Sequence, residues 1–281
     1  MAKDLSHLPG TGGGQPPQGA GHHQPPPITR YHSDGRPASD RNVILPLEVR
    51  QVDLILNRTH LIHELDFRVE AGRRTVILGP NGAGKSLTMR LCHGLIPPSR
   101  GRIDWRGPLG GNPQQVRRHQ AMVFQKPVHL RRSVRENVAF ILRKRGFGGE
   151  DLRARIDSAL HRARLEHLAT RPARALSMGE QQRLALARVW VMKPSILFLD
   201  EPTASLDPAA TKDVEALILA LHQASTTIFF ASHDIGQAQR IADDVIFMSG
   251  GRILEQCPAD MFFDRPATRE GRAYIAGELL A

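Results

Sequence analysis

Short runs of apolar and β-branched residues alternate with longer stretches of helical pattern from about Leu45 onward. Three of the runs, at 75–78, 195–199 and 226–231, are almost continuous. Continuous runs of this kind are typical of strands that are covered on both faces, as in the parallel sheets of α/β proteins. The pattern therefore predicts an α/β fold built around a mostly parallel sheet.

The first part of the chain has a different composition. Residues 1–42 are rich in Gly, Pro, Gln and His, as in 10–14 (GTGGG) and 25–27 (PPP), and contain hardly any apolar residue. Such a segment buries too little apolar surface to offset the entropy lost on folding. We therefore expect a disordered tail over 1–42, followed by one domain over 43–281.

A second change of pattern occurs between about 128 and 190, where β-branched runs are few and arginines and alanines are frequent. We interpret this stretch as a helical insertion. Between 130 and 175, twelve Lys and Arg residues stand against five Asp and Glu residues, which accounts for most of the formal net charge of +10. Nucleic acid, an anionic membrane surface and a solvated helix face are all compatible with such a charge.

The chain contains no apolar run close to the about 20 residues that a membrane-spanning helix needs, and no apolar stretch follows Lys3 as in a signal peptide. We therefore expect a cytoplasmic location. Cys92 and Cys257 are the only cysteines, which is too few for a disulfide scaffold, and we expect both to be reduced.

A phosphate-binding loop is predicted at 79–86, where GPNGAGKS matches G-x-x-x-x-G-K-[ST] between a strand and a helix expected from Leu87. In such loops backbone N–H groups and a helix N-terminus bind phosphate, the lysine reaches the outer phosphates and the serine holds Mg²⁺. A loop of this type indicates that the protein binds a nucleotide but does not indicate the reaction, because kinases, GTPases and transport ATPases share it. The expected contacts are Gly79, Pro80, Asn81, Gly82, Ala83, Gly84, Lys85, Ser86 and Leu87.

Two carboxylates, Asp200 and Glu201, follow the apolar run 196–199. In an open parallel sheet they would lie at the carboxyl edge, where ligands bind. We expect Asp200 to hold Mg²⁺ and Glu201 to act as general base on the attacking water, a role worth roughly 10²- to 10⁴-fold in rate. The alternative is a pair that forms caps or salt bridges, which we would favour without the phosphate loop.

Residues 176–183 (LSMGEQQR) open a predicted helix and resemble the LSGGQ signature of ABC-type ATPases. Five further motifs stand in the order found in that family: the phosphate loop, Gln125 in 123–127, the carboxylate pair, Asp207 in 205–207, and His233. The resemblance covers 45 to about 250. It implies a P-loop NTPase fold with a mixed, mostly parallel sheet, an N-terminal antiparallel β part and a helical subdomain.

The resemblance also implies roles for individual residues. Two copies of the chain would pack head to tail and enclose ATP and Mg²⁺, with Asp207 bridging them. Gln125 would sense the Mg²⁺ and the water and connect the site to a permease, and His233 would bind the γ-phosphate. The implied catalytic residues are Glu201, His233, Gln125 and Lys85, the Mg²⁺ residues are Ser86, Gln125 and Asp200, and the residues that contact ATP from the other copy are Ser177, Met178, Gly179 and Glu180.

The chain departs from the family pattern at two positions. Met178 stands where the signature usually has glycine, and Leu56 falls where the family commonly carries an aromatic residue that stacks on adenine. A side chain at 178 is expected to loosen or reshape that half of the ATP site. Neither departure removes a charged group, so we still expect ATPase activity.

Segments 123–134 (VFQKPVHLRRSV) and 277–280 (GELL) resemble the ATPase subunits of tungstate importers, with phosphate importers close behind. The resemblance implies a second copy of the chain, transmembrane permease subunits and, indirectly, a substrate-binding protein as partners. It places the subunit peripherally on the cytoplasmic face of the inner membrane, and no nucleic acid is expected. Two rival hypotheses are a soluble ABC ATPase that acts on nucleic acid or ribosomes, and a small-molecule kinase.

Overall fold

A computed structural model of the chain describes residues 43–278. The segment 1–42, for which the sequence predicts disorder, lies outside the described residues, as do residues 279–281.

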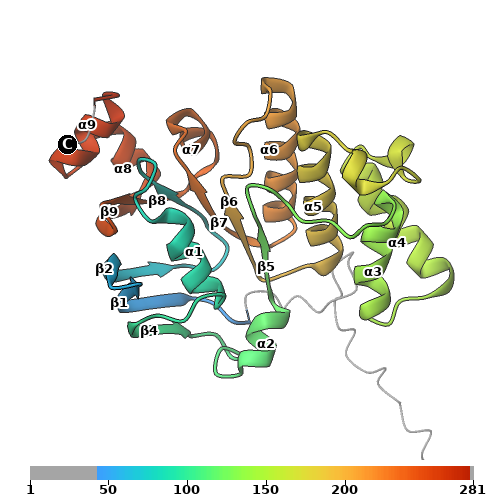
Figure 1. Ribbon diagram of the computed structural model, residues 1–281, viewed down its shortest axis with the longest axis horizontal. Helices are drawn as coiled ribbons and strands as arrows, with labels where there is room; N and C mark the ends of the chain where they lie inside the picture. Colours follow the sequence, from blue (N-terminus) through green and yellow to red (C-terminus); the bar gives the residue numbers. More distant parts are fainter. Residues whose placement is uncertain (1–42, 279–281) are drawn as a thin grey trace, which may run out of the picture. The chain divides into compact units, whose positions relative to one another are not determined.

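The central sheet has six strands in the order β5-β6-β7-β3-β8-β9 (Figure 1). Five of the strands are parallel, and β9 pairs antiparallel with β8. The three continuous apolar runs became β3, β6 and β7, each within one residue of the predicted limits. The strands are β3 (Arg74–Leu78), β5 (Gln120–Val123), β6 (Ile196–Asp200), β7 (Thr227–Ser232), β8 (Asp244–Ser249) and β9 (Arg252–Pro258).

A separate antiparallel sheet, in the order β2-β1-β4, comes from the N-terminal part of the described chain. It consists of β1 (Leu47–Leu56), β2 (Thr59–Val69) and β4 (Arg100–Trp105). Its buried face packs on one side of the central sheet, where Phe67 meets Phe229 with ring centroids 6.0 Å apart. The mixed sheet and the antiparallel β part therefore confirm the predicted fold class.

Helices follow most strands and cover the central sheet (Figure 1). Three of them, α3 to α5, lie between β5 and β6, inside the stretch that we interpret as a helical insertion. None of the helices within 43–278 is both long and apolar enough to cross a membrane. The helices are α1 (Lys85–His93), α2 (Pro113–Arg118), α3 (Val134–Lys144), α4 (Gly149–Arg162), α5 (Met178–Met192), α6 (Pro208–Gln223), α7 (Ile235–Ile241), α8 (Ala259–Asp264) and α9 (Arg269–Ile275).

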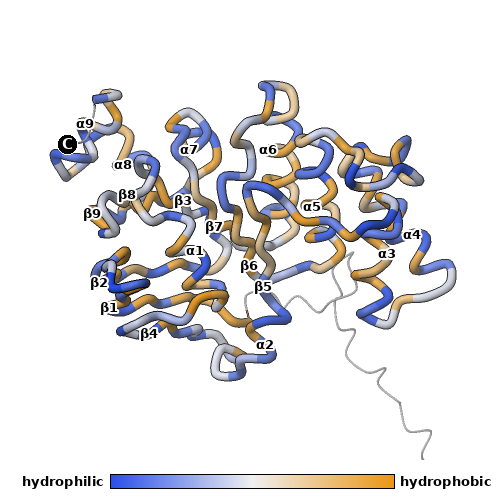
Figure 2. The backbone as a smooth tube through the Cα atoms, viewed as in Figure 1, coloured by the Kyte–Doolittle hydropathy of each residue, from blue (hydrophilic) through white to orange (hydrophobic). Residues whose placement is uncertain are grey.

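The central strands are buried on both faces, and Figure 2 shows them as mostly hydrophobic. Successive residues of a strand point to opposite faces, so each strand supplies two cores. Leu197 and Leu199 of β6 join the core under the helices, whereas Ile196 and Phe198 join the core shared with the antiparallel sheet. This double burial holds the carboxyl ends of the strands in a fixed arrangement.

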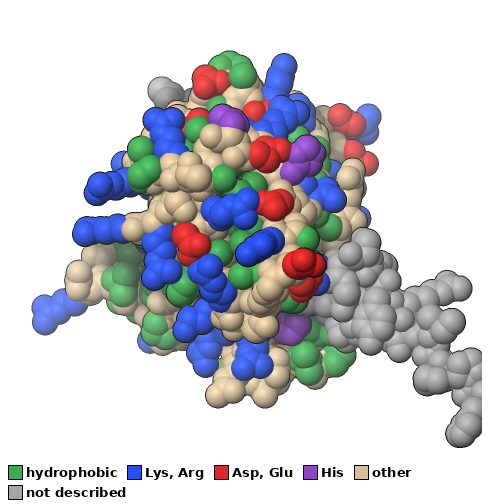
Figure 3. Space-filling view, turned by 90° about the vertical axis from the view of Figure 1, so that its right-hand side faces the viewer, with side chains coloured by type: hydrophobic (Ala, Val, Ile, Leu, Met, Phe, Trp, Pro, Cys, Tyr) green, Lys and Arg blue, Asp and Glu red, His purple; other side chains and the backbone are tan. Residues whose placement is uncertain are grey.

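Lys and Arg side chains gather on the face that α3 and α4 build (Figure 3). Several of these arginines are paired with nearby acids, as in Arg143 with Glu136 and Arg155 with Asp151. Exposed pairs of this kind contribute only about 0–1 kcal/mol each. The basic composition of the insertion is therefore partly neutralised on its own surface.

Candidate ATP-binding and hydrolysis site

The phosphate loop joins the end of β3 to the start of α1, as the motif requires. A Cβ atom at Gly79 would lie 2.0 Å from the carbonyl oxygen of Met248, so only glycine fits there. Gly84 has a φ of 101° and caps α1, which therefore begins at Lys85 rather than at the predicted Leu87. The first helical turn thus starts inside the motif, with its free N–H groups at the loop.

Lys85 lies across the loop with its side chain almost fully buried, 5% exposed. Its Nζ donates hydrogen bonds to the carbonyl oxygens of Gly79 (2.9 Å) and Pro80 (3.0 Å), and lies 3.5 Å from Oε1 of Glu201. Burial lowers the pKa of Lys85, and the negative charge of Glu201 opposes this shift. An anion in the loop would meet a lysine that is already oriented and poorly hydrated.

Ser86 and Asp200 come together from α1 and β6. The Ser86 hydroxyl donates a hydrogen bond of 2.6 Å to Oδ1 of Asp200, which is only 4% exposed. Burial raises the pKa of Asp200, while the bond from Ser86 and the charge of Arg90 lower it. A site with one bound cation would relieve this burial cost.

The donor set fits Mg²⁺. Residues 43–278 contain no cluster of three or more His, Cys, Asp and Glu side chains that could hold a metal ion by themselves. Mg²⁺ in nucleotide sites does not require such a cluster, because it is bound through one or two protein oxygens together with phosphate oxygens and water. The adjacent hydroxyl and carboxylate of Ser86 and Asp200 are ligands of that kind.

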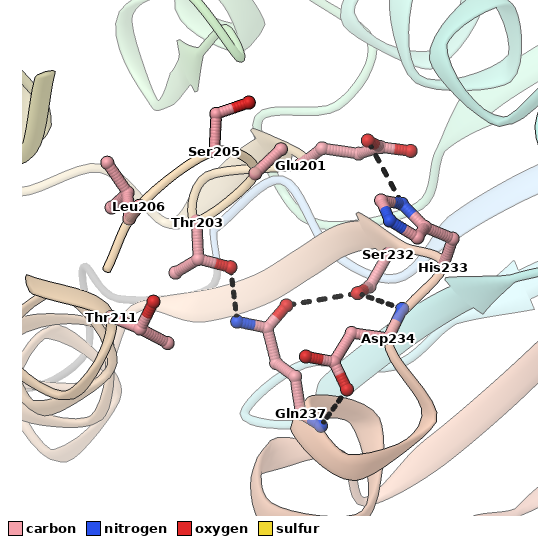
Figure 4. A pocket seen from close by; sticks show the side chains of 10 residues that line it. Glu201, Thr203, Ser205, Leu206, Thr211, Ser232, His233, Asp234 and Gln237 are labelled. Atoms are coloured by element: carbon pink, nitrogen blue, oxygen red, sulfur yellow. Dashed lines mark hydrogen bonds and ion pairs between the residues drawn. The ribbon is translucent and has the colours of Figure 1, made fainter. Parts of the chain in front are cut away.

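Glu201 turns away from β6 and meets His233, which follows β7. Its backbone has a φ of 47°, an unusual conformation for a residue other than glycine, and its N–H donates to the carbonyl oxygen of Ala231 (3.1 Å). Oε2 of Glu201 lies 3.2 Å from Nδ1 of His233 (Figure 4). Backbone conformations of this type cost about 1–3 kcal/mol and cluster at functional sites.

A buried polar network, which the sequence did not suggest, lies beside this pair (Figure 4). Gln237, 1% exposed, donates to Oγ1 of Thr203 (2.7 Å) and to Glu215 (3.2 Å), and accepts a bond from the Ser232 hydroxyl (3.0 Å). Thr203 follows Glu201 by two residues. The network therefore connects the loop after β6 to the end of β7. Thr203, Ser232 and Gln237 line a cavity of about 230 Å³, which Glu201 also lines.

Gln125 follows β5 at the same edge of the sheet. Because Val123 pairs with Leu199, the residues after β5 lie next to Asp200 and Glu201 at the end of β6. The carbonyl oxygen of Gln125 accepts a bond of 2.8 Å from Nε2 of Gln182. Gln182, in the signature helix, was not singled out from the sequence because one glutamine in a helix carries no positional signal.

Asp207 caps α6 by accepting a hydrogen bond from the N–H of Ala210 (2.8 Å). Ala210 also packs on the signature helix, since a Cβ atom added at Gly179 would lie 2.9 Å from its Cβ. The capping contact is the ordinary role for an aspartate at this position.

Ser177 begins the signature helix α5. Its hydroxyl accepts a bond from the N–H of Glu180, and the Glu180 carboxylate accepts the N–H of Ser177 at 2.7 Å. Met178 is 37% exposed. Across residues 43–278, no hydrogen bond or ion pair joins residues 177–180 to the phosphate loop of the same chain. Ser177 and Glu180 therefore satisfy each other's backbone N–H groups at the start of the helix.

Leu56 ends β1 with 42% of its surface exposed. An exposed leucine there offers an aliphatic surface, without the stacking that an aromatic ring provides.

The chain is similar to known proteins. The family model for the ABC transporter matches residues 62–204. The tungstate uptake system ATP-binding protein TupC of Peptoclostridium acidaminophilum is 38% identical over 195 residues, covering 69% of this chain and 88% of that protein. The phosphate import ATP-binding protein PstB 1 of Lactiplantibacillus plantarum is 34% identical over 245 residues, covering 83% and 91%. Other matching relatives are named for different cargoes.

The fold is also similar to that of a solved ABC transporter subunit. The structure of CbiO1 from Clostridium perfringens, part of the ABC transporter complex CbiONQ, superposes with a TM-score of 0.69 at 32% identity, covering 78% of this chain and 91% of that one. The motif order, the geometry at the carboxyl edge and these relatives lead to one assignment. The chain belongs to the ABC transporter family, as one of its ATP-binding and ATP-hydrolysing subunits.

Proposed function

We propose that this subunit hydrolyses ATP to energise the import of a small oxyanion, with tungstate favoured, through a separate permease. ATP hydrolysis is supported by one observation. At the carboxyl edge of the sheet, the carboxylate of Glu201 lies within ion-pair distance of both Lys85 and His233. Lys85 holds the outer phosphates. Glu201 takes the proton of the attacking water, and His233 orients the γ-phosphate and that water.

Mg²⁺ neutralises charge on the phosphates when it is bound. Ser86 and Asp200 are the residues that would hold it, with Gln125 at the neighbouring strand end. The hydrogen bond that now joins Ser86 to Asp200 keeps the two oxygens directed at one point. The protein therefore presents a preorganised pair of hard ligands before nucleotide arrives.

The second half of the site is contributed by another copy of the chain. Within residues 43–278, no hydrogen bond or ion pair joins residues 177–180 to the phosphate loop of their own chain, and the N-terminus of a 15-residue helix favours an anion. Ser177 and the N–H of Gly179 contact the γ-phosphate from the second copy, beside Met178 and Glu180. Asp207, next to the same helix through Ala210, lies at the contact between the copies.

The relatives support the proposed cargo and partners. Tungstate and phosphate are both tetrahedral oxyanions, and relatives named for each cover most of the chain. We infer that the partners are transmembrane permease subunits and, through them, a substrate-binding protein, with the ATPase peripheral on the cytoplasmic face of the membrane. An importer of phosphate or of another small solute is the alternative.

One experiment tests both parts. Full-length chain is purified with its partners from native membranes, reconstituted into proteoliposomes, and assayed for ATP hydrolysis with tungstate, phosphate or nickel supplied with the binding protein. Stimulation by tungstate alone supports the proposal, and stimulation by phosphate supports the alternative. Recovery of ribosomes or nucleic acid in place of a membrane protein would favour a soluble ABC ATPase and contradict the transport role.

A further inference from the structure

Tyr274, in α9, brings the C-terminal part of the described chain to the catalytic loops. Its ring centroid lies 5.3 Å from that of Phe247, a buried residue of β8 that pairs with Leu78 at the end of β3. The Tyr274 hydroxyl donates a hydrogen bond of 3.0 Å to the carbonyl oxygen of His233. A residue far along the chain therefore contacts the main chain of the histidine that pairs with Glu201.

The phenol also faces the first residue of the phosphate loop. Burial, followed by the charges of Glu201 and Asp234, raises the pKa of Tyr274 to about 12, while the backbone N–H of Gly79 acts in the opposite direction. The hydroxyl is consequently protonated at neutral pH and able to donate. It lies between the loop that begins at Gly79 and the loop that carries His233.

The segment that carries the phenol is attached to β9 independently of this contact. Glu255 accepts hydrogen bonds from the N–H groups of Ala267 (2.9 Å) and Thr268 (3.2 Å). Arg272 closes the turn with bonds to the carbonyl oxygens of Pro266 (2.9 Å) and Ala267 (3.0 Å). The segment that carries the phenol is therefore also held by contacts that do not involve Tyr274.

We propose that Tyr274 is a positioning residue for ATP hydrolysis, whose hydroxyl fixes the main chain of His233 next to the phosphate loop so that the imidazole stays on Glu201. The inference rests on the proposed roles of Glu201 and His233. Tyr274 itself touches none of the reacting atoms. It acts by restricting the loop that follows β7. Without this restriction the loop could shift His233 by a fraction of an ångström, which is enough to affect catalysis.

The main alternative is that the phenol only anchors α9. Tyr274→Phe distinguishes the two, because it removes one oxygen and leaves the ring on Phe247. Arg269→Ala is the matched control, since it replaces an exposed residue of the same helix without touching His233 or the turn that Arg272 closes. For the full-length chain with ATP and Mg²⁺, we expect Tyr274→Phe to lower kcat about 5-fold, the value of one typical hydrogen bond, with KM for ATP unchanged. Arg269→Ala is expected to keep the wild-type kcat.

A double-mutant cycle gives the decisive readout. In a His233→Ala background Tyr274→Phe is expected to cause no further loss, because the route through the histidine is already gone. The inference is overturned if Tyr274→Phe leaves kcat unchanged, if Arg269→Ala lowers kcat equally, or if the losses of Tyr274→Phe and His233→Ala simply add. A wild-type chain that releases no phosphate from ATP would instead overturn the proposed function, and the inference with it.

Discussion

Nδ1 of His233 lies 3.2 Å from Oε2 of Glu201, while the other carboxylate oxygen of Glu201 lies 3.5 Å from Nζ of Lys85. The carboxylate therefore lies between two basic groups that belong to different loops. Under the proposed function, a γ-phosphate that entered this space would compete with Glu201 for both of them. Nucleotide binding would then free the carboxylate to take up the attacking water, and would so couple binding to activation of the base.

Lys85→Ala is expected to weaken ATP binding at least about 10-fold, because it removes a buried cation that is already directed at the loop. Isothermal titration with ATP measures this directly. Lys144→Ala, at an exposed lysine of α3, is the control and should bind ATP normally. Normal ATP affinity and turnover in Lys85→Ala would count against the assignment of the loop.

Removal of Mg²⁺ with a chelator should abolish hydrolysis. Ser86→Ala should raise the Mg²⁺ concentration for half-maximal activity about 10-fold, since it removes one of the two adjacent oxygens that are proposed to hold the ion. Phosphate release measured across a Mg²⁺ titration gives the shift. An unchanged titration midpoint in Ser86→Ala would show that the hydroxyl is not a ligand.

Gln237→Leu is expected to lower the free energy of unfolding by about 1–3 kcal/mol, because Thr203, Ser232 and Glu215 lose a buried partner. Urea denaturation of the full-length chain measures the change. Gln223→Leu, at an exposed position that ends α6, is the matched control and should unfold like the wild type. Equal stability of all three proteins would mean that the network contributes nothing measurable.

His129 is expected to make stability depend on pH. Burial, assisted by the positive charge of Arg188, lowers the pKa of His129 to about 4. The unfolded chain, with a histidine pKa near 6.5, therefore binds more protons between about pH 4 and pH 6.5. Stability contributed by the neutral ring is complete above about pH 6.5 and is lost as the pH falls toward 4, by at most about 3 kcal/mol and by less where water reaches the ring.

The measurement is the melting temperature between pH 4 and pH 7. His129→Leu should flatten the curve, whereas His167→Leu, at an exposed histidine, should leave its slope unchanged. A wild-type slope in His129→Leu would assign the pH dependence to other groups.

The sequence predicted three central strands, β3, β6 and β7, and the strand and helix that flank the motif at 79–86, because these features are encoded over a few consecutive residues. The strand at 75–78 is one residue longer at its start in the structure, and α1 begins two residues before its predicted start because Gly84 caps it. Tyr274 and Gln237 could not be predicted. Their hydrogen-bond partners, His233 and Thr203, lie 41 and 34 residues away in the sequence. Such contacts depend on the order of the strands in the sheet, which local periodicity does not reveal.

The most direct test of the account is the mass of Glu201→Gln in the presence of ATP and Mg²⁺, measured by light scattering. The amide cannot take the proton from water, so bound ATP should persist and hold two copies together through Lys85 of one and Ser177 of the other. We predict a doubled mass that returns to that of the monomer when ATP is removed or when Ser177→Arg is added. A protein that binds ATP and stays monomeric would contradict the shared site.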